Sequence, residues 1–149
     1  MSPVQPRPMS ADDTDMVQVP VGPMSGSSVL VVEDDVDVLS LLSTHLTTLG
    51  CQVSRASSGE DGLRRALADP PDVIIIDVVL PGMNGLELAL ALRDDARTRK
   101  TRLVMTSVMD REDLVEIQQS CGTDAILPKP FSRRDVVAAL GPWSSGTGS

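Results

Sequence analysis

The sequence predicts one α/β domain, built as a parallel β-sheet with helices on both faces. Two observations carry this prediction. Short apolar runs typical of buried strands alternate with stretches of helical periodicity. This strand-and-helix pair repeats five times in about 114 residues, with short connections. In such a sheet, every loop from a strand to the following helix lies at the same edge, where ligands bind.

The predicted strands are short runs rich in β-branched and aliphatic residues. They lie at 29–32, 52–56, 73–77, 103–106 and 125–127. The third run, Val-Ile-Ile-Ile-Asp, has no alternating polar residue, which indicates a strand buried on both faces. It ends in Asp77. An Asp that begins a turn is common. Asp77 therefore becomes a candidate functional residue only because other strands bring polar residues to the same edge of the sheet.

Capping residues and helix breakers delimit the predicted helices. Asp35 is suited to cap the first helix, which is amphipathic and ends before Gly50. Ser58 and Ser132 are suited to cap the second and fifth helices, which run to residues 67 and 140. The third and fourth helices are predicted at 86–92 and 110–120, and a charged connection at 94–102.

Composition and charge exclude several classes of protein. The chain has 149 residues, a hydrophobic fraction of 41% and a net charge of -8, which argues against nucleic acid as a direct partner. Cys51 and Cys121 show no metal-binding or redox spacing, so free thiols are expected. The sequence contains no apolar run of about 20 residues, so no membrane span is predicted, and no signal peptide is visible. We therefore predict a cytoplasmic protein.

The ends of the chain differ in composition from its middle. Residues 1–27 are rich in proline and lack periodicity, which predicts a disordered tail. This tail could be a docking segment or a solvated leader, or Met24 could be the true start, and the sequence leaves these alternatives open. Residues 28–141 form the predicted domain, and 142–149 a short flexible tail.

Four of the five strand ends carry polar residues. Glu33-Asp34-Asp35 follow the first strand, Asp77 ends the third, Ser107 follows the fourth, and Lys129 follows the fifth. Because the carboxyl ends of parallel strands meet at one edge, we expect these side chains to converge. Four strand ends with polar residues at one edge are much less expected by chance than a single one.

The converging residue types predict phosphoryl chemistry. Crowded carboxylates repel one another, and a hard divalent cation, Mg²⁺ or Mn²⁺, relieves the repulsion with oxygen ligands. We predict Glu33, Asp34, Asp77 and the backbone carbonyl of Val79 as these ligands. Asp77 would be the nucleophile and would form an aspartyl phosphate.

Two further side chains complete the predicted site. Lys129 would hold one phosphoryl oxygen and Ser107 another, while the metal would offset the remaining charge. An ionised carboxylate is already nucleophilic, so no general base is required.

The sequence around these residues resembles the receiver (CheY-like) domain of two-component response regulators. The likeness covers 28–141 and rests on the segments Val-Leu-Val-Val-Glu33-Asp34-Asp35, Ile-Ile-Ile-Asp77-Val-Val-Leu-Pro-Gly-Met-Asn-Gly85 and Leu-Pro-Lys129-Pro-Phe131. The intervals of 30 residues (107 − 77) and 22 residues (129 − 107) also match, and they select Ser107 over Thr106 as the switch hydroxyl.

The resemblance implies a flavodoxin-like (βα)5 three-layer sandwich with the sheet order 2-1-3-4-5. It implies phosphoryl transfer from a sensor histidine kinase or a histidine phosphotransfer protein, an unidentified downstream protein, and a cis Lys129-Pro130 bond. It leaves open a homodimer through the fourth helix, fifth strand and fifth helix. Because the chain stops about eight residues after the last helix, a stand-alone receiver is expected.

Four positions depart from the family's pattern. Val108 follows the switch hydroxyl, where a small residue is usual, and should narrow access to Asp77. Ile126 stands where an aromatic switch residue is usual, which puts that switch in doubt and leaves loop and helix shifts to carry the output. Val79 and Met109 occupy positions that tune hydrolysis in the family. Because apolar side chains cannot orient an attacking water, we expect a long-lived phosphoryl group.

Two other functions remain as alternatives. A degenerate receiver would bind partners without phosphorylation, but it would be expected to lack a site residue, and none is missing. A phosphohydrolase with an aspartyl-phosphate intermediate would carry a second Asp two residues after the nucleophile, where this chain has Val79. We therefore predict a phosphoacceptor that dephosphorylates itself slowly, and not an enzyme with turnover.

Overall fold

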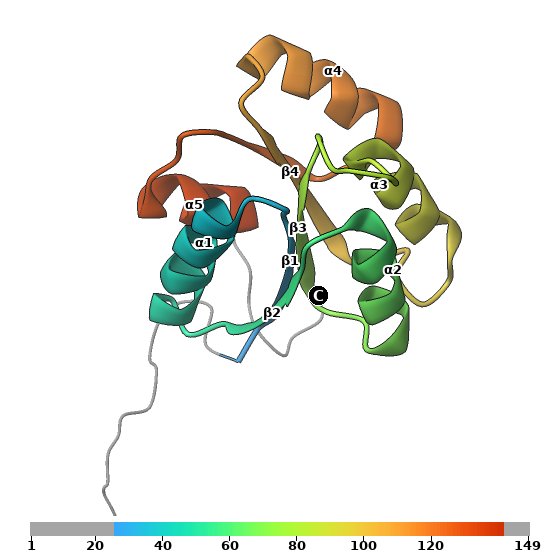
Figure 1. The fold of residues 1–149 in the computed structure, drawn as a ribbon, viewed down its shortest axis with the longest axis horizontal. Coiled ribbons are helices and arrows are strands. Elements are labelled where there is room, and N and C mark those ends of the chain that lie inside the picture. The colour runs from blue at the N-terminus through green and yellow to red at the C-terminus, as the bar shows by residue number, and fades with distance from the viewer. Residues whose placement is uncertain (1–25, 142–149) are drawn as a thin grey trace, which may run out of the picture.

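The protein is described by a computed structural model that covers residues 26–141. Five parallel strands form one sheet in the order β2-β1-β3-β4-β5, with helices on both faces (Figure 1). The elements in chain order are β1 (Ser28–Val32), α1 (Val36–Thr48), β2 (Gln52–Ala56), α2 (Gly59–Ala68), β3 (Val73–Asp77), α3 (Gly85–Asp94), β4 (Arg102–Ser107), α4 (Arg111–Cys121), β5 (Ala125–Pro128) and α5 (Arg133–Leu140). The predicted fold class and strand order are confirmed.

The sheet separates two apolar cores. Helices α1 and α5 cover one face, and α2, α3 and α4 cover the other (Figure 1). The central strand β3 is buried along its whole length, and its side chains alternate between the cores: Ile74 and Ile76 pack toward α2–α4, and Ile75 packs toward α1 and α5. This burial on both faces explains the unbroken apolar run in the sequence.

The predicted caps are present at three helices. Asp35 accepts from Asp37 N–H at 2.9 Å, and Ser58 and Ser132 cap α2 and α5. Asp110 stands at the N-cap of α4 but makes no side-chain cap hydrogen bond.

Some element boundaries differ from the prediction by one or two residues. Helix α3 begins at Gly85 because Asn84 and Glu87 form a capping box, with hydrogen bonds of 2.9 and 3.0 Å. It continues to Asp94, into the segment predicted as a charged connection. Strand β4 runs from Arg102 to Ser107, longer than predicted.

The structure also includes two residues that the sequence assigned to the disordered tail. Gly26 N–H donates to Gly50 O at 3.1 Å, and Ser27 O accepts from Gln52 N–H at 2.7 Å. Ser27 is buried. The rest of the predicted tails, 1–25 and 142–149, and the alternative start at Met24 lie outside the described residues. Within residues 26–141, no helix has the length and apolar character needed to cross a membrane.

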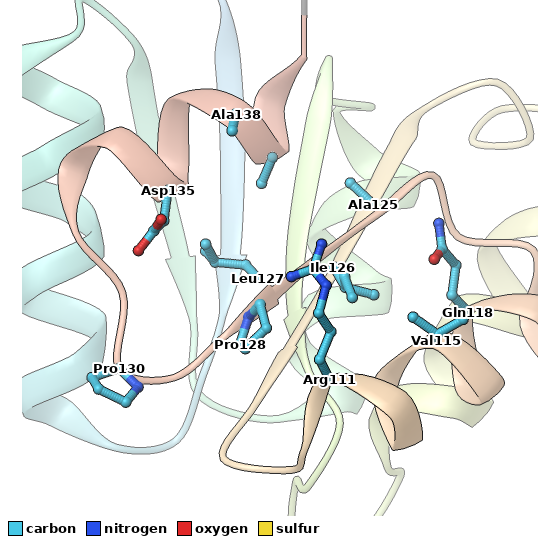
Figure 2. A pocket seen from close by; sticks show the side chains of 11 residues that line it. Arg111, Val115, Gln118, Ala125, Ile126, Leu127, Pro128, Pro130, Asp135 and Ala138 are labelled. Atoms are coloured by element: carbon cyan, nitrogen blue, oxygen red, sulfur yellow. The ribbon is translucent and has the colours of Figure 1, made fainter.

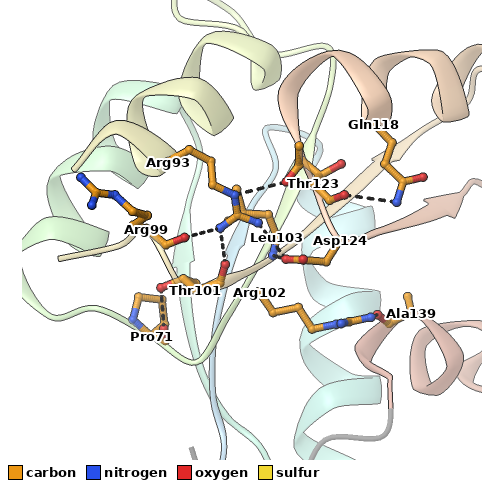
Figure 3. Close-up of polar contacts among 11 residues, drawn as sticks. Pro71, Arg93, Arg99, Thr101, Arg102, Leu103, Gln118, Thr123, Asp124 and Ala139 are labelled. Carbon is orange, nitrogen blue, oxygen red and sulfur yellow. Dashed lines mark hydrogen bonds and ion pairs between the residues drawn. The ribbon is translucent and has the colours of Figure 1, made fainter. Parts of the chain in front are cut away.

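The amino edge of the sheet is closed by arginine side chains (Figure 3). Arg93 on α3 donates to the carbonyls of Thr101, Arg99 and Gly122 at 2.6, 2.9 and 3.2 Å. It also pairs with Asp124 at 2.8 Å. The same Asp124 oxygen accepts from Leu103 N–H at 2.8 Å. Arg93 therefore ties α3, the start of β4 and the α4–β5 loop together.

Arg102 makes a second tie at this edge (Figure 3). Its guanidinium donates to Ala139 O with Nη2 at 2.9 Å and Nε at 3.2 Å. These bonds satisfy a carbonyl in the last turn of α5, where the helix leaves acceptors without partners.

Candidate phosphoryl-acceptor site

Two adjacent strands bring the principal carboxylates together at the carboxyl edge. Strands β1 and β3 pair in parallel, with Val32 opposite Ile76. Glu33 and Asp77, the next residue in each segment, therefore follow this pair on adjacent strands. Glu33 is 1% exposed and Asp77 5% exposed. Two nearly buried acids side by side require compensation, because burial disfavours each charge and the charges repel.

Lys129 supplies part of that compensation. Its Nζ lies 2.8 Å from Glu33 Oε1 and 3.1 Å from Asp77 Oδ2. The residue follows β5, which is separated from β3 by β4, so the long side chain reaches across the end of β4. Its backbone N–H is anchored on Ser107 O at 2.8 Å. The peptide bond from Lys129 to Pro130 is cis, as the resemblance implied.

The pKa shifts at the site reflect burial and pairing. Burial raises the pKa of Glu33, and the contacts with Lys129 and with Asp35 N–H offset this only in part. Burial disfavours the Lys129 ammonium, but the Glu33 and Asp77 carboxylates outweigh that effect and raise the pKa of Lys129. Lys129 therefore remains a cation at neutral pH.

Backbone contacts fix the two carboxylates further. Val79 N–H donates to Asp77 Oδ1 at 3.0 Å, and Asp35 N–H donates to Glu33 Oε2 at 3.1 Å. Gly85 packs directly on Asp77, since a Cβ added at Gly85 would lie 2.3 Å from Asp77 O. A side chain at position 85 would thus push the acceptor strand and its loop apart.

The acids form a set that suits a hard cation. Glu33, Asp34 and Asp77 each offer an oxygen within 4.8 Å of the others. Asp34 is exposed, so this group opens toward solvent on one side. When the three carboxyl groups are ionised, the single positive charge of Lys129 leaves an excess of negative charge. Oxygen-only ligands with room for water are what Mg²⁺ prefers, so the donor set fits this ion.

The two hydroxyls at the end of β4 differ in their use. Thr106 Oγ1 donates to Leu127 O at 2.6 Å, a buried bond that commits it to β5. Ser107 Oγ accepts from Met109 N–H at 3.4 Å, which is long for a hydrogen bond. Ser107 is the last residue of its strand and is 1% exposed. This difference favours Ser107 over Thr106 as the switch hydroxyl, and Ser107 is also the residue that the intervals in the sequence select.

The residues that depart from the family's pattern lie in two environments. Val79 and Val108 are 62% and 79% exposed, on loops at the carboxyl edge. Met109 and Ile126 are half-buried and pack against the α2–α4 core.

Ile126 also lines a groove between α4, β5 and α5 (Figure 2). The groove has a volume of about 600 Å³. In Figure 2, Arg111 on α4 and Asp135 on α5 extend from opposite walls. It is distinct from the acid cluster, because none of its lining residues is Glu33, Asp34 or Asp77.

Sequence reasoning missed two contacts of the site. It assigned Lys129 to a phosphoryl oxygen and did not foresee its ion pair with Glu33. It also passed over Glu60 on α2, whose Oε2 accepts from Met83 N–H at 3.0 Å, within the loop after Asp77. The two partners are 23 residues apart, so no local sequence pattern signals the contact.

The chain resembles known proteins in sequence. The family described as "Response regulator receiver domain" matches residues 29–141. The alkaline phosphatase synthesis transcriptional regulatory protein PhoP of Bacillus subtilis is 34% identical over 112 residues, 75% of this chain and 46% of PhoP. The chain thus spans about half the length of the curated relatives it matches first.

Solved structures share the fold. The chemotaxis protein CheY4 of Vibrio cholerae has a TM-score of 0.73 at 28% identity, covering 78% of this chain and 97% of CheY4. The receiver domain of the sensor histidine kinase PA1611 of Pseudomonas aeruginosa, solved with magnesium in its active site cleft, has a TM-score of 0.73 at 24% identity over 80% of this chain and 98% of that domain. Taken with the family match over residues 29–141, these likenesses mean that the chain belongs to the response regulator receiver domain family of two-component signalling.

Proposed function

We propose that Asp77 of this receiver accepts a phosphoryl group from a phosphohistidine of a sensor histidine kinase or a histidine phosphotransfer protein. One observation carries the proposal: Asp77 ends the buried central strand, with Lys129 on one carboxylate oxygen and Val79 N–H on the other, beside two more acids. Receiver domains act as phosphoacceptors, and this arrangement equips Asp77 for that role.

The transfer requires one bond to form and one to break. A carboxylate oxygen of Asp77 attacks phosphorus, and the bond from phosphorus to the donor's imidazole nitrogen breaks. The electron pair of that bond remains on the nitrogen, which then takes a proton from water. Lys129 Nζ, held by both acids, can move from Asp77 Oδ2 to an incoming phosphoryl oxygen without leaving Glu33. Preorganised charge of this kind stabilises the transition state.

Glu33, Asp34, Asp77 and the carbonyl of Val79 would hold Mg²⁺ or Mn²⁺. When bound, the ion supplies charge neutralisation for the carboxylates and the phosphoryl oxygens. The fit rests on three carboxylate oxygens within 4.8 Å and on their excess of charge over the single Lys129.

Ser107 serves as the switch hydroxyl of the proposed mechanism. Its Oγ is free of the strong bond that commits Thr106, so it can turn to donate to a phosphoryl oxygen on Asp77. Such a movement would carry the β4–α4 loop with it, and with this loop the start of α4. Because Ile126 has no ring to reorient, the signal passes through shifts of the loop and helix.

The surface formed by α4, β5 and α5 is the proposed output surface. The groove of about 600 Å³ on this surface is lined by Pro128, which pairs with Ser107 in the register of β4 and β5 (Figure 2). Arg111 and Asp135 on its opposite walls carry opposite charges, so two copies related by a two-fold axis could pair them reciprocally. A downstream protein is the other occupant that this surface suits. The action of the chain as a stand-alone receiver stays a prediction.

We also propose that the phosphoryl group persists. Val79 and Met109 offer no polar side-chain atom to orient an attacking water, and the near-complete burial of Asp77 limits access. Release of phosphate from purified, phosphorylated protein should take many minutes. Release within seconds would contradict this part of the proposal.

The function is tested by labelling with acetyl phosphate. Wild-type protein should gain one phosphoryl group when Mg²⁺ is present and none when the metal is chelated. Asp77→Asn should gain none in either condition. Absence of labelling in the wild type would favour a receiver that binds partners without phosphorylation, and steady turnover of p-nitrophenyl phosphate would favour a phosphohydrolase.

A further inference from the structure

We infer that Glu60 is a positioning residue for the loop that carries Asp77 and Val79. Its carboxylate holds the turn of the β3–α3 loop against α2 and thereby fixes how this loop presents its groups to the metal. The inference rests on the function proposed above and assigns a role to a residue outside the acid cluster.

The loop is anchored at its ends by backbone contacts. Val78 N–H donates to Thr106 O at 2.9 Å, and Gly85 N–H donates to Val78 O at 3.0 Å. Between these anchors, Met83 N–H donates to Glu60 Oε2 at 3.0 Å. Among the hydrogen bonds of residues 26–141, this is the one that a side chain of another element makes with residues 80–83.

The glycines around this contact show how closely the loop and α2 approach. A Cβ added at Gly59 would lie 2.4 Å from Met83 O, so only a glycine leaves room for that carbonyl. Gly82 has a φ of +68°, and a Cβ there would lie 2.8 Å from Glu60 Oε2. At both positions the backbone of the loop lies close to the first turn of α2, and the Glu60 carboxylate contacts the loop at Gly82 and Met83.

The turn is coupled to the site through a short piece of backbone. Val79 N–H holds Asp77 Oδ1, and its carbonyl is a proposed metal ligand. Leu80 is buried, and Pro81 has a restricted φ, so two of the three residues between Val79 and Met83 have little freedom to absorb a displacement at Met83. Loss of the Glu60 bond would therefore loosen both the carboxylate and the carbonyl of the site.

A structural role for Glu60 would have a different signature. An acid in the first turn stabilises a helix through its dipole, and Asp61 is a second acid in the same turn, paired with Arg64 and Arg65. Glu60→Gln removes the charge but keeps an oxygen that can accept from Met83 N–H. Glu60→Ala removes both. Asp61→Ala is the matched control, because it weakens the helix start without touching the loop.

The experiment measures Mg²⁺ affinity of the unphosphorylated protein by calorimetry, together with hydrogen exchange of the Met83 amide by NMR. Glu60→Ala should bind Mg²⁺ about tenfold more weakly, the lower end of what residues supporting metal ligands contribute, and Met83 should exchange faster. Glu60→Gln and Asp61→Ala should bind within about threefold of wild type.

Two results would overturn the inference alone: wild-type affinity in Glu60→Ala, or equal losses in Glu60→Ala and Glu60→Gln, which would assign the effect to charge. A wild-type protein that binds no Mg²⁺ would overturn the proposed function, and this inference with it.

Discussion

The two edges of the sheet use charged side chains in opposite ways. At the amino edge, Arg93 finds four acceptors, including the carboxylate of Asp124, and the ion pair is well matched (Figure 3). At the carboxyl edge, three acids lie close together, and among residues 26–141 the lysine that pairs with two of them, Glu33 and Asp77, is Lys129. Those two acids are almost fully buried. One edge is electrostatically satisfied and the other is not.

This difference indicates which edge of the sheet is suited to bind a ligand. A satisfied network gains nothing from a further ion, because its donors and acceptors are already paired. A crowded group of acids is stabilised by a cation that offsets its negative charge, and functional sites commonly trade stability for this readiness. The amino edge therefore contributes stability, and the carboxyl edge contributes chemistry.

The largest expected effect is at Lys129. Lys129→Met removes the only cation that touches the acids among residues 26–141, while it keeps most of the side-chain volume. Labelling of Asp77 by acetyl phosphate should slow by at least about 100-fold, as for the loss of one preorganised donor. Stopped-flow or mass-spectrometric time courses at fixed Mg²⁺ would measure this, and a rate within a few-fold of wild type would contradict the role assigned to Lys129.

Arg93→Ala should lower the stability of the protein and leave the labelling of Asp77 unchanged. It removes the side-chain bonds to Thr101, Arg99, Gly122 and Asp124, so the free energy of unfolding should fall by about 2 kcal/mol. Urea titration would measure the loss. Labelling per folded molecule should stay unchanged, and a labelling defect at full folding would show that the two edges are coupled.

Magnesium should stabilise the wild-type protein through the carboxyl edge. At a free Mg²⁺ concentration ten times Kd, the unfolding free energy should rise by about 1.4 kcal/mol. Asp34→Asn should lose most of this gain, while Arg93→Ala should keep it although its baseline is lower. Thermal unfolding with Mg²⁺ against chelator would measure both, and an equal gain in Asp34→Asn would place the ion elsewhere.

The last prediction concerns the two free cysteines, Cys51 and Cys121, which are both buried. Burial raises the pKa of Cys51 to about 11 from an ordinary value of 9.0 and also raises that of Cys121. At pH 8 the thiolate of Cys51 should thus be about 100-fold scarcer than that of an ordinary thiol, and its alkylation should quicken as pH rises toward 11. Iodoacetamide kinetics would test this in native protein, with urea-unfolded protein as control.

The sequence predicted which side chains gather at the carboxyl edge, but it did not predict the contacts of the amino edge. The site residues lie one or two positions after an apolar run, so the parallel topology alone predicts their convergence: Glu33, Asp34, Asp77, Ser107 and Lys129. Arg93, in the last turn of α3, and Asp124, in the α4–β5 loop, are 31 residues apart. Their pairing depends on how α3 and the α4–β5 loop pack, which no local pattern encodes.

The same limit applies within the site. Glu60 meets Met83 only because two glycines let α2 and the β3–α3 loop approach, and neither glycine signals this in the sequence. The ion pair of Lys129 with Glu33 was likewise hidden, since strand ends predict a shared edge but not which charges touch.

The central claim is that Asp77 itself receives the phosphoryl group. Tandem mass spectrometry after labelling with acetyl phosphate and Mg²⁺, with borohydride reduction to convert an acyl phosphate to a stable alcohol, tests it most directly. We expect that the reduced residue is Asp77 and that no other residue is reduced. Reduction at Glu33 or Asp34, or a phosphoryl group that survives borohydride on a hydroxyl side chain, would contradict it.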